Sequence, residues 1–390
     1  MKSFSPIIQN FQVQYQYKLY FTNHLFSLEN ELFKNLIEEY RAVEAVKMLF
    51  VIDAEVNAKH PNLGTEIQSY CSNHKKYIDC TSLLIVEGGE ACKNNHGNVD
   101  RILQGINEDR IDRHSFVVAI GGGAVIDMVG YAATIAHRGV KLIRIPTTVL
   151  SQNDAAVGVK NSINTFGKKN FLGTFATPYA IINDQRFLHT LEDRDWISGV
   201  AEAVKVALIK DASFFKYIKE NAIALRQREM EPMQYVIYRC AQMHMEHIAK
   251  GGDPFESGSS RPLDFGHWAA HKLEHMTNYE VRHGEAVAIG IALDVVYAHH
   301  IGLISEESLQ EIISVLENIG FDLRIPIDER NDVDELLMGI QEFREHLGGQ
   351  LTITLISAIG KKHDVHEIDR KQMKEAIHTL NTMASVKSLS

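Results

Sequence analysis

The sequence predicts an α/β domain followed by a helical domain. In the first half, short β-rich runs alternate with helical stretches, which is the pattern of βαβ units in a largely parallel sheet. From about Asp193 onward, apolar residues recur at helical spacing instead. A chain of 390 residues, 45% hydrophobic and 23% charged, is long enough to bury two cores. We therefore expect domains at 1–188 and 189–390, with an active site in the cleft between them.

Five runs in the first domain have the apolar, β-branched character of buried strands. In chain order they are VKMLFVIDAEV, YIDCTSLLIVEGGE, SFVVAIGGG, KLIRIPTTVL and YAIINDQRFL. Three segments of the second domain are expected to be helical: DWISGVAEAVKVALIKDASFFKYI, EESLQEIISVLENIGF and HEIDRKQMKEAIHTL. A loop rich in Gly, Pro and Ser, residues 250–266, interrupts these helices and leads into a histidine-bearing helix. Loops that deliver polar residues to a helix start often carry function.

The bulk properties exclude several classes of protein. A formal net charge of −10 argues against a nucleic-acid or anionic-membrane surface, which would need a cationic footprint. We find neither a signal-peptide pattern nor a long uncharged apolar segment, so we expect no membrane insertion and a cytoplasmic protein. The four cysteines are too few and scattered for a disulfide framework or a thiolate zinc site. A metal would therefore need His and carboxylate ligands.

A glycine-rich turn lies between a predicted strand and a predicted helix in SFVVAIGGGAVIDMVGYAATIAHRG. Gly121, Gly122 and Gly123 would let the backbone approach a diphosphate, whose charge the helix N-terminus favours. The dinucleotide fingerprint is incomplete, because Ile126 stands where a third glycine is expected. The alternative interpretation is a turn that serves only tight strand-to-helix packing.

Histidines and a glutamate in the second half could hold a metal. Glu202 lies in GVAEAVK, His267 and His271 lie in GHWAAHKLE, and His283 lies in RHGEAVAIG. Two neutral imidazoles and one carboxylate suffice for a catalytic zinc-type site with an open position. His267 and His271 are four residues apart on one helix and can face one cleft. Taken alone, such a pair is more often a packing or surface feature.

The segment IPTTVLSQNDAAVGVKNSINTFGKKNFLGTF combines lysines with amides. Its donors, expected on a loop after a strand, could bind phosphates and sugar hydroxyls; they are Lys160, Asn164, Lys168, Lys169 and Asn170. A solvated surface loop is the alternative, since most lysines are exposed. The number of donors in an acidic protein favours a local anion site.

Seven motifs together make the chain recognisable. GGGAVIDMVGYAA, HRGV, IPTTVLSQNDAAVGVKNSIN, GKKNFLGTF, GVAEAVKVALIKD, GHWAAHKLE and HGEAVAIG occur in the order and spacing of the 3-dehydroquinate synthase family. The chain resembles that family over roughly residues 45–365. The resemblance implies an α/β NAD-binding domain, an all-α C-terminal domain and a homodimer.

The resemblance also implies roles for individual residues. A divalent metal, zinc or cobalt, would be held by Glu202, His267 and His283. NAD would be held by Asp53, Glu90, Lys93, Gly122, Gly123, Asp127, Thr147, Thr148, Asp154 and Thr190, with Lys160 and Lys169 between cofactor and substrate. Substrate contacts would come from Asn170 and His271 to phosphate, from Lys205 to a hydroxyl, and from Arg138 to the neighbouring subunit's phosphate.

The implied reaction is the cyclisation of a sugar phosphate. NAD oxidises a ring hydroxyl, phosphate is eliminated, the ketone is reduced again, and the opened ring closes by an intramolecular aldol step. The transient carbonyl acidifies the adjacent C–H, and the substrate phosphate is well placed to take that proton. The protein then mainly positions groups and stabilises charge.

Some substrate positions depart from the family pattern. Where the family has an arginine followed by LNxGH, this chain has SSRPLDFGHW, so Asp264 replaces the asparagine and Arg261 is displaced by one position. Glu246 stands where a lysine is expected, and Lys250 could replace it only if the loop is shortened. Since that lysine and arginine grip the substrate carboxylate, their loss would leave a buried charge poorly compensated.

Near the C-terminus, FREHLGG replaces the family's Asp-Lys-Lys, which puts Arg344, Glu345 and His346 where a phosphate-binding lysine is expected. We therefore expect a substrate without the carboxylate, of the sedoheptulose 7-phosphate type, and a valiolone-like product. The resemblance to valiolone synthases is partial, because those enzymes generally have Ser-Pro where this chain continues AAHKLE. The alternatives are a 3-dehydroquinate synthase in which Arg261 and Lys250 reach the carboxylate, and a catalytically dead NAD-binding scaffold.

Overall fold

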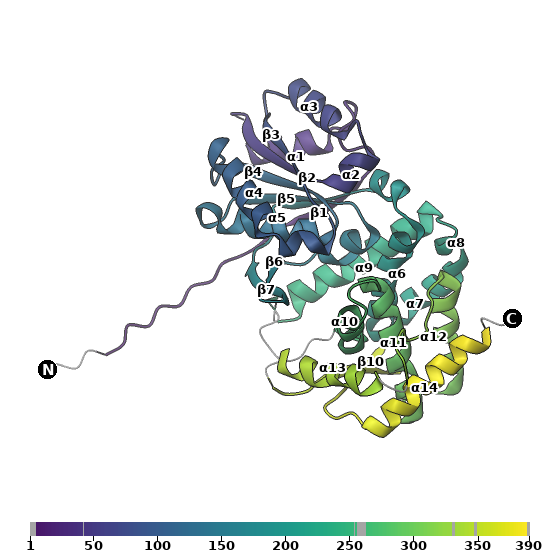
Figure 1. Ribbon diagram of the computed structural model, residues 1–390. Helices are drawn as coiled ribbons and strands as arrows, with labels where there is room; N and C mark the ends of the chain where they lie inside the picture. Colours follow the sequence, from purple (N-terminus) through teal and green to yellow (C-terminus); the bar gives the residue numbers. More distant parts are fainter. Residues whose placement is uncertain are drawn as a thin grey trace.

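The computed structural model joins a sheet-containing domain to a helical domain (Figure 1). It describes residues 5–41, 43–252, 254–255, 263–329, 332–346 and 349–387. The expected α/β domain is present in the first half and the expected helical domain in the second. Among the described residues, no helix is both long and apolar enough to cross a membrane.

The first domain is built on a six-stranded sheet in which every strand pair is parallel. Its strands are β1 (Lys18–Thr22), β2 (Val46–Asp53), β3 (Ile78–Val86), β4 (Phe116–Gly121), β5 (Lys141–Pro146) and β8 (Ala180–Asp184), in the order β1-β8-β5-β4-β2-β3. The five strands expected from the sequence are all present. The central ones are almost continuously buried, as strands covered on both faces must be.

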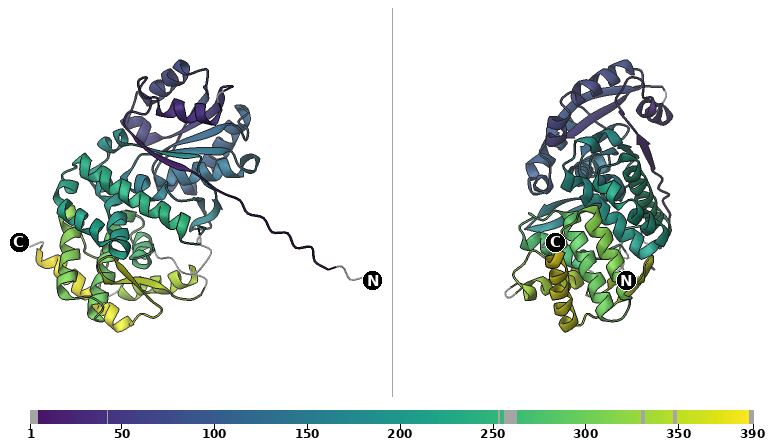
Figure 2. Two further views of the ribbon diagram at one scale, coloured as in Figure 1. Left: turned by 180° about the vertical axis from the view of Figure 1, so that it is seen from behind. Right: turned by 90° about the vertical axis from the view of Figure 1, so that its right-hand side faces the viewer.

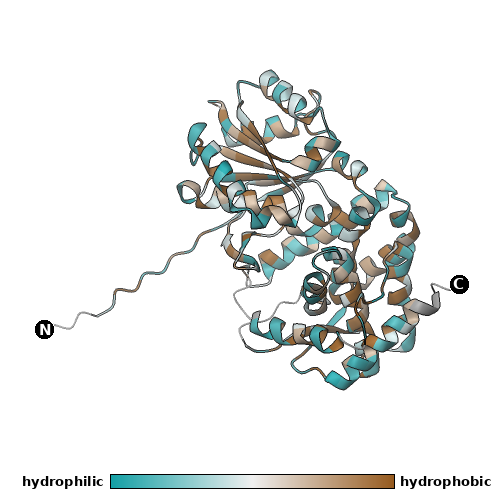
Figure 3. Cartoon of the chain, in the orientation of Figure 1, coloured by the Kyte–Doolittle hydropathy of each residue, from teal (hydrophilic) through white to brown (hydrophobic). Residues whose placement is uncertain are grey.

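Helices cover both faces of this sheet (Figure 2). One face packs against α1 (Leu32–Tyr40) and α3 (Leu63–Asn73), and the other against α4 (His96–Glu108) and α5 (Gly123–Ile135). Shorter turns complete the domain: α2 (Ala54–Lys59), η1 (Glu90–Asn94), η2 (Ala136–Arg138), η3 (Ser151–Ala155) and η4 (Gln185–Thr190). Hydropathy follows the layers, since the strands are largely brown in Figure 3.

The lysine-rich segment is a β-hairpin, not the loop that we expected. Strands β6 (Lys160–Thr165) and β7 (Lys168–Phe175) pair antiparallel around a two-residue turn, Phe166 and Gly167. Both turn residues have positive φ, 53° and 69°, which matches the twist that tight hairpins require. Phenylalanine rarely adopts this conformation, so the sequence carried only a weak turn signal.

The second domain is a bundle of helices around one core. They are α6 (Asp193–Lys210), α7 (Ala212–Glu220), α8 (Ala222–Arg226), α9 (Met230–Lys250), α10 (His267–Met276), α11 (His283–His300), α12 (Glu306–Ile319), α13 (Val333–His346) and α14 (Arg370–Lys387). The bundle also contains a two-stranded hairpin that we did not expect, β9 (Ile353–Ala358) and β10 (Lys361–Val365). Helix α11 is apolar almost all round and lies inside the bundle, which brings its N-terminus to the first domain.

Candidate active site

A cleft of about 830 Å³ lies between the two domains. Its walls are the carboxyl ends of β2, β4 and β5 on one side and the N-terminus of α11 with part of α10 on the other. Ligands of open α/β sheets bind at this edge, beyond the carboxyl ends of the strands. Of the candidate residues, those that line the cleft are Asp53, Glu90, Lys93, Gly122, Gly123, Asp127, Thr147, Thr148, Asp154, Lys169, Asn170, Thr190, His271 and His283.

The glycine turn lies at the junction of β4 and α5. A Cβ atom at Gly121 would lie 2.9 Å from Val125, and one at Gly123 would lie 2.9 Å from Ala155, so both positions need glycine for packing. At Gly122 the nearest atom would be 3.6 Å away, and this residue is the N-cap of α5. The packing interpretation thus holds for two glycines. Gly122 leaves an open approach to a helix N-terminus, where an anion is favoured.

A buried ion pair joins this turn to the hairpin. Lys93 Nζ lies 2.9 Å from Asp127 Oδ2, on α5, and also donates to Asn170 Oδ1, on β7. Ser162 Oγ donates to the same Asn170 oxygen at 2.9 Å. Burial raises the pKa of Asp127, and Lys93 opposes that shift. These bonds fix the hairpin against the domain that carries the glycine turn.

Glu202, His267 and His283 meet at the base of the cleft. They come from α6 and from the first residues of α10 and α11, and their candidate ligand atoms all lie within 4.8 Å of one another. Glu202 Oε1 lies 3.5 Å from His267 Nε2 and 3.5 Å from His283 Nε2. A tetrahedral ion with ligand bonds of about 2.1 Å separates its donor atoms by about 3.4 Å. The three side chains therefore have the spacing of a metal site.

The hydrogen bonds around the triad fit an ion as well. His267 Nδ1 lies 3.0 Å from the carbonyl oxygen of Phe265, which leaves Nε2 to face Glu202. Both carboxylate oxygens of Glu202 are buried, and neither accepts a hydrogen bond of good geometry. A buried carboxylate without donors is costly unless a charge compensates it. Lys205 supplies part of that charge through an ion pair, and a cation between the imidazoles would supply the rest.

Charge interactions shift the pKa values of this group strongly. Burial alone would raise the pKa of Glu202, but Lys205 and His267 hold it well below its usual range. Burial would lower the pKa of His283, but Glu202 and Glu274 outweigh burial and raise it to about 10. Desolvation within the cleft, with His267 and His283 nearby, lowers the pKa of His271, whose side chain is exposed to the cleft. In its neutral form this imidazole can donate a hydrogen bond from one nitrogen.

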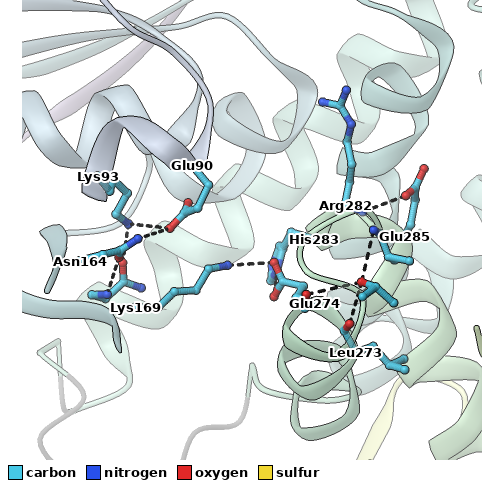
Figure 4. Close-up of polar contacts among 12 residues, drawn as sticks. Glu90, Lys93, Asn164, Lys169, Leu273, Glu274, Arg282, His283 and Glu285 are labelled. Atoms are coloured by element: carbon cyan, nitrogen blue, oxygen red, sulfur yellow. Dashed lines mark hydrogen bonds and ion pairs between the residues drawn. The ribbon is translucent and has the colours of Figure 1, made fainter. Parts of the chain in front are cut away.

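Glu274 belongs to this group, although the sequence analysis did not single it out. Its Oε2 lies 3.3 Å from His283 Nδ1, and its Oε1 accepts from Lys169 Nζ at 2.9 Å. In Figure 4, Lys169 reaches across the cleft from the hairpin to this carboxylate. The sequence spacing could have identified Glu274, because it lies seven residues after His267 and therefore on the same face of the helix. A second cluster, His271, Glu274 and His283, also has ligand atoms within 4.8 Å of one another.

Six further candidate residues either do not line the cleft or fall outside the described residues. Lys205 is buried beneath it, and Asp264 contributes to the raised pKa of Lys205. Lys160, at the start of β6, is exposed outside the lining. Arg138 is exposed in η2, just beyond the C-terminal end of α5 and 15 residues beyond Gly123. Arg261 and the side chain of His346 lie outside the described residues.

Lys250 does not line the cleft. It lines a separate apolar groove with Tyr17, Tyr238, Pro254 and Phe255. The cation that a rearranged loop would need for a substrate carboxylate is therefore not supplied by Lys250 in this structure.

Comparison with family models matches both halves of the chain. Residues 83–198 match the model of the 3-dehydroquinate synthase N-terminal domain, and residues 199–343 match that of the C-terminal domain. Among curated relatives, a 3-dehydroquinate synthase of Aliivibrio fischeri is 36% identical over 297 residues, 76% of this chain and 81% of that protein. One from Shewanella loihica is 33% identical over 299 residues, 76% of this chain and 82% of that protein.

Solved structures share the fold over nearly the whole chain. The 2-epi-5-epi-valiolone synthase ValA of Streptomyces hygroscopicus subsp. jinggangensis, solved with NAD+ and Zn2+ bound, is 27% identical. The match covers 97% of this chain and 100% of the ValA chain, with a TM-score of 0.85. A 2-deoxy-scyllo-inosose synthase, 22% identical over 93% of this chain and 96% of its own, has a TM-score of 0.76 and shows the same fold.

Proposed function

The chain belongs to the 3-dehydroquinate synthase family, and from that premise we propose that it converts a seven-carbon ketose phosphate, such as sedoheptulose 7-phosphate, into a carbocycle with loss of phosphate. In reaction class this is a carbon–oxygen lyase acting on a phosphate. The observation that carries the proposal is the single cleft in which a glycine turn, Lys169 and Asn170 face a Glu–His–His triad.

We assign NAD to the sheet side of the cleft and a divalent ion, zinc or cobalt, to the triad. The residues that would hold NAD are Asp53, Glu90, Lys93, Gly122, Gly123, Asp127, Thr147, Thr148, Asp154, Lys160, Lys169 and Thr190. Glu202, His267 and His283 would hold the ion. When bound, NAD takes and returns a hydride within one turnover, and the ion polarises the oxygens of the substrate.

The remaining residues would bind and orient the substrate. Asn170 and the imidazole of His271 would donate to its phosphate from opposite walls. Lys205 would donate to a hydroxyl: burial lowers its pKa, but Glu202 and Asp154 outweigh burial and raise it. A lysine that stays cationic cannot serve as a general base. The substrate phosphate is then the base at hand for the elimination.

The charges beside the triad support a substrate with a neutral head. Asp264 acts on Lys205 from the residues just before His267, and Asp154 acts on the same lysine. A substrate carboxylate at this position would meet Asp264 and Glu202, which would repel it. A hydroxymethyl group would instead donate hydrogen bonds to Asp264.

The second candidate is 3-dehydroquinate synthase itself. Relatives that carry this name are 36% and 33% identical to the chain, more than the valiolone synthase at 27%. This candidate requires a cation for the carboxylate of its substrate. Of the two cations considered for this role, Arg261 is the one left, since Lys250 lines the apolar groove.

We also propose a homodimer in the cytoplasm. Helix α5 has 13 residues and is about 20 Å long, so Arg138, in η2 beyond its far end, would serve a phosphate in a neighbouring copy. All four cysteines are free thiols, which suits a reducing compartment.

A reaction that contains much less NAD than substrate tests the proposed chemistry. We expect the metal-loaded protein to release many equivalents of phosphate per NAD, without net NADH, because oxidation and reduction cancel within one turnover. Absorbance at the NADH band measures NADH, and a phosphate assay on the same sample measures the phosphate released. NADH that accumulates in step with product would show a net dehydrogenase and refute the proposal.

A further inference from the structure

The first described residues form an extended arm that leaves the body of the protein. In Figures 1 and 2 the arm projects away from both domains. No backbone hydrogen bond joins residues 5–16 to another described residue. Strand pairing begins only at Lys18, in β1.

The arm has the side-chain pattern of a strand with one apolar face. Phe11, Val13 and Tyr15 alternate with Gln12, Gln14 and Gln16, which is a period of two. The exposed fractions of its large apolar side chains are high: Ile7 96%, Ile8 79%, Phe11 83%, Val13 60% and Tyr15 59%. The same face continues through Tyr17, Leu19 and Phe21, which pack against the body. The arm is therefore the less covered half of one long strand, and its last residues, such as Val13 and Tyr15, line the groove that Lys250 also lines.

The arm also lacks the usual protection of an exposed strand. Residues 5–17 contain no charged side chain, although the chain carries a net charge of −10. Soluble proteins guard free strand edges with charges, bulges or a covering element. An unguarded apolar strand of this length is an aggregation hazard unless a partner covers it.

A matching surface lies at the base of the same arm. Phe255 contacts both Tyr15 and Phe175, with ring centroids 6.4 Å and 5.1 Å apart. On β7, Phe171, Leu172 and Phe175 are 49%, 38% and 52% exposed. Within the described residues β7 pairs only with β6, so its other edge can accept a strand. We call this edge, with its three apolar side chains, the seat.

We propose that the arm of one copy of this chain pairs with the seat of a second copy, and reciprocally, to form a two-fold dimer. The arm and the seat lie next to each other on the same molecule. A single two-fold axis can therefore place each arm on the partner's seat, which leaves no arm or seat open for a third copy. The apolar face of each arm carries four large side chains, Ile7, Phe11, Val13 and Tyr15, which cover on the order of 100–200 Å² apiece. When the surface that they cover on the two seats is counted as well, the buried area reaches the roughly 1,200 Å² that a stable interface needs.

This inference deepens the proposed homodimer but rests on none of the proposed chemistry, so assembly and turnover can fail independently. The test is the molar mass of the full chain in solution across a dilution series. We compare Phe11→Glu/Val13→Glu with Gln12→Glu/Gln14→Glu, which adds the same charges to the other face of the same strand. Circular dichroism checks that each variant is folded.

The wild type and the glutamine control should be dimers, with dissociation constants within about three-fold of each other, while Phe11→Glu/Val13→Glu should weaken the dimer by at least about 100-fold. A monomeric wild type, or equal assembly of the two variants, would overturn the proposal.

Complementation tests the seat. A seat variant, Phe171→Glu/Phe175→Glu, should be monomeric alone, but mixed with the arm variant it should form a heterodimer through one intact arm and one intact seat. If the mixture stays monomeric, the arms do not use this seat and the proposed pairing is wrong.

Discussion

At the scale of single residues, the metal triad gives the sharpest prediction. His267→Ala removes one of three candidate ligands and leaves Glu202 and His283. We expect the variant to lose stoichiometric metal after dialysis against a weak chelator, as measured by plasma emission. His275→Ala is the matched control, because His275 is an exposed histidine on the same helix. A His267→Ala protein that retains one ion per chain would refute the triad.

Glu274 should act on the ion through His283. A carboxylate bonded to the outer nitrogen of a ligating histidine fixes the ring and raises its basicity. We therefore expect Glu274→Gln to weaken metal binding by about 10–100-fold in a competition titration with a chromophoric chelator. Glu280→Gln, at the same wall of the cleft, should leave affinity unchanged. Complete loss of metal in Glu274→Gln, with full binding in His267→Ala, would instead place the ion in the second cluster.

Asp264 should set the choice of substrate. Replacing it with asparagine removes a negative charge beside Lys205 and the triad without changing shape. We expect kcat/KM for a 2-keto-3-deoxy acid phosphate, relative to sedoheptulose 7-phosphate, to rise by about ten-fold, roughly 1.4 kcal/mol. Glu55→Gln removes the same charge at the cofactor end of the cleft and should leave the ratio unchanged. An unchanged ratio in Asp264→Asn would disprove this role.

At the scale of elements, one buried arginine supports the hairpin that carries Lys169 and Asn170. Arg144 on β5 is fully buried, and its guanidinium donates to Ala156 O at 2.8 Å, Gly158 O at 2.6 Å and Asn161 Oδ1 at 2.7 Å. Burial lowers the pKa of Arg144 to about 10, so the side chain is still charged at neutral pH. It satisfies carbonyl groups that have to turn inward where the chain enters β6.

Arg144→Met should therefore destabilise the protein. It leaves several buried acceptors without donors, each at a cost of about 1–3 kcal/mol. We expect the free energy of unfolding in urea to fall by at least about 3 kcal/mol. Arg324→Met, an exposed arginine that pairs with Asp322, should change it by less than about 0.5 kcal/mol. Equal stability of the two variants would mean that the hairpin does not depend on Arg144.

At the scale of the whole molecule, the sequence predicted the features that depend on neighbouring residues in the chain. It did not predict the features that depend on contacts between distant segments. Five of the six strands of the sheet and helices such as α12 were predictable, because hydrophobic patterning is a local property, whereas β1 was not foreseen. The hairpin was missed because its turn uses Phe166 at positive φ. Asp264 and Lys205 were named from motifs, but their proximity depends on how α6 packs against the residues before α10. The free arm was not foreseen, because its pattern resembles that of a paired strand.

Phosphate release from two substrates tests the central claim most directly. The same preparation, loaded with NAD and zinc or cobalt, is given sedoheptulose 7-phosphate or the seven-carbon 2-keto-3-deoxy acid phosphate at equal concentration, and the product mass is recorded. We predict fast phosphate release and a carbocyclic product from sedoheptulose 7-phosphate, with little from the acid, because Asp264 and Glu202 repel a carboxylate. Efficient turnover of the acid with an inert sedoheptulose 7-phosphate would make the protein a 3-dehydroquinate synthase and contradict our account of Asp264.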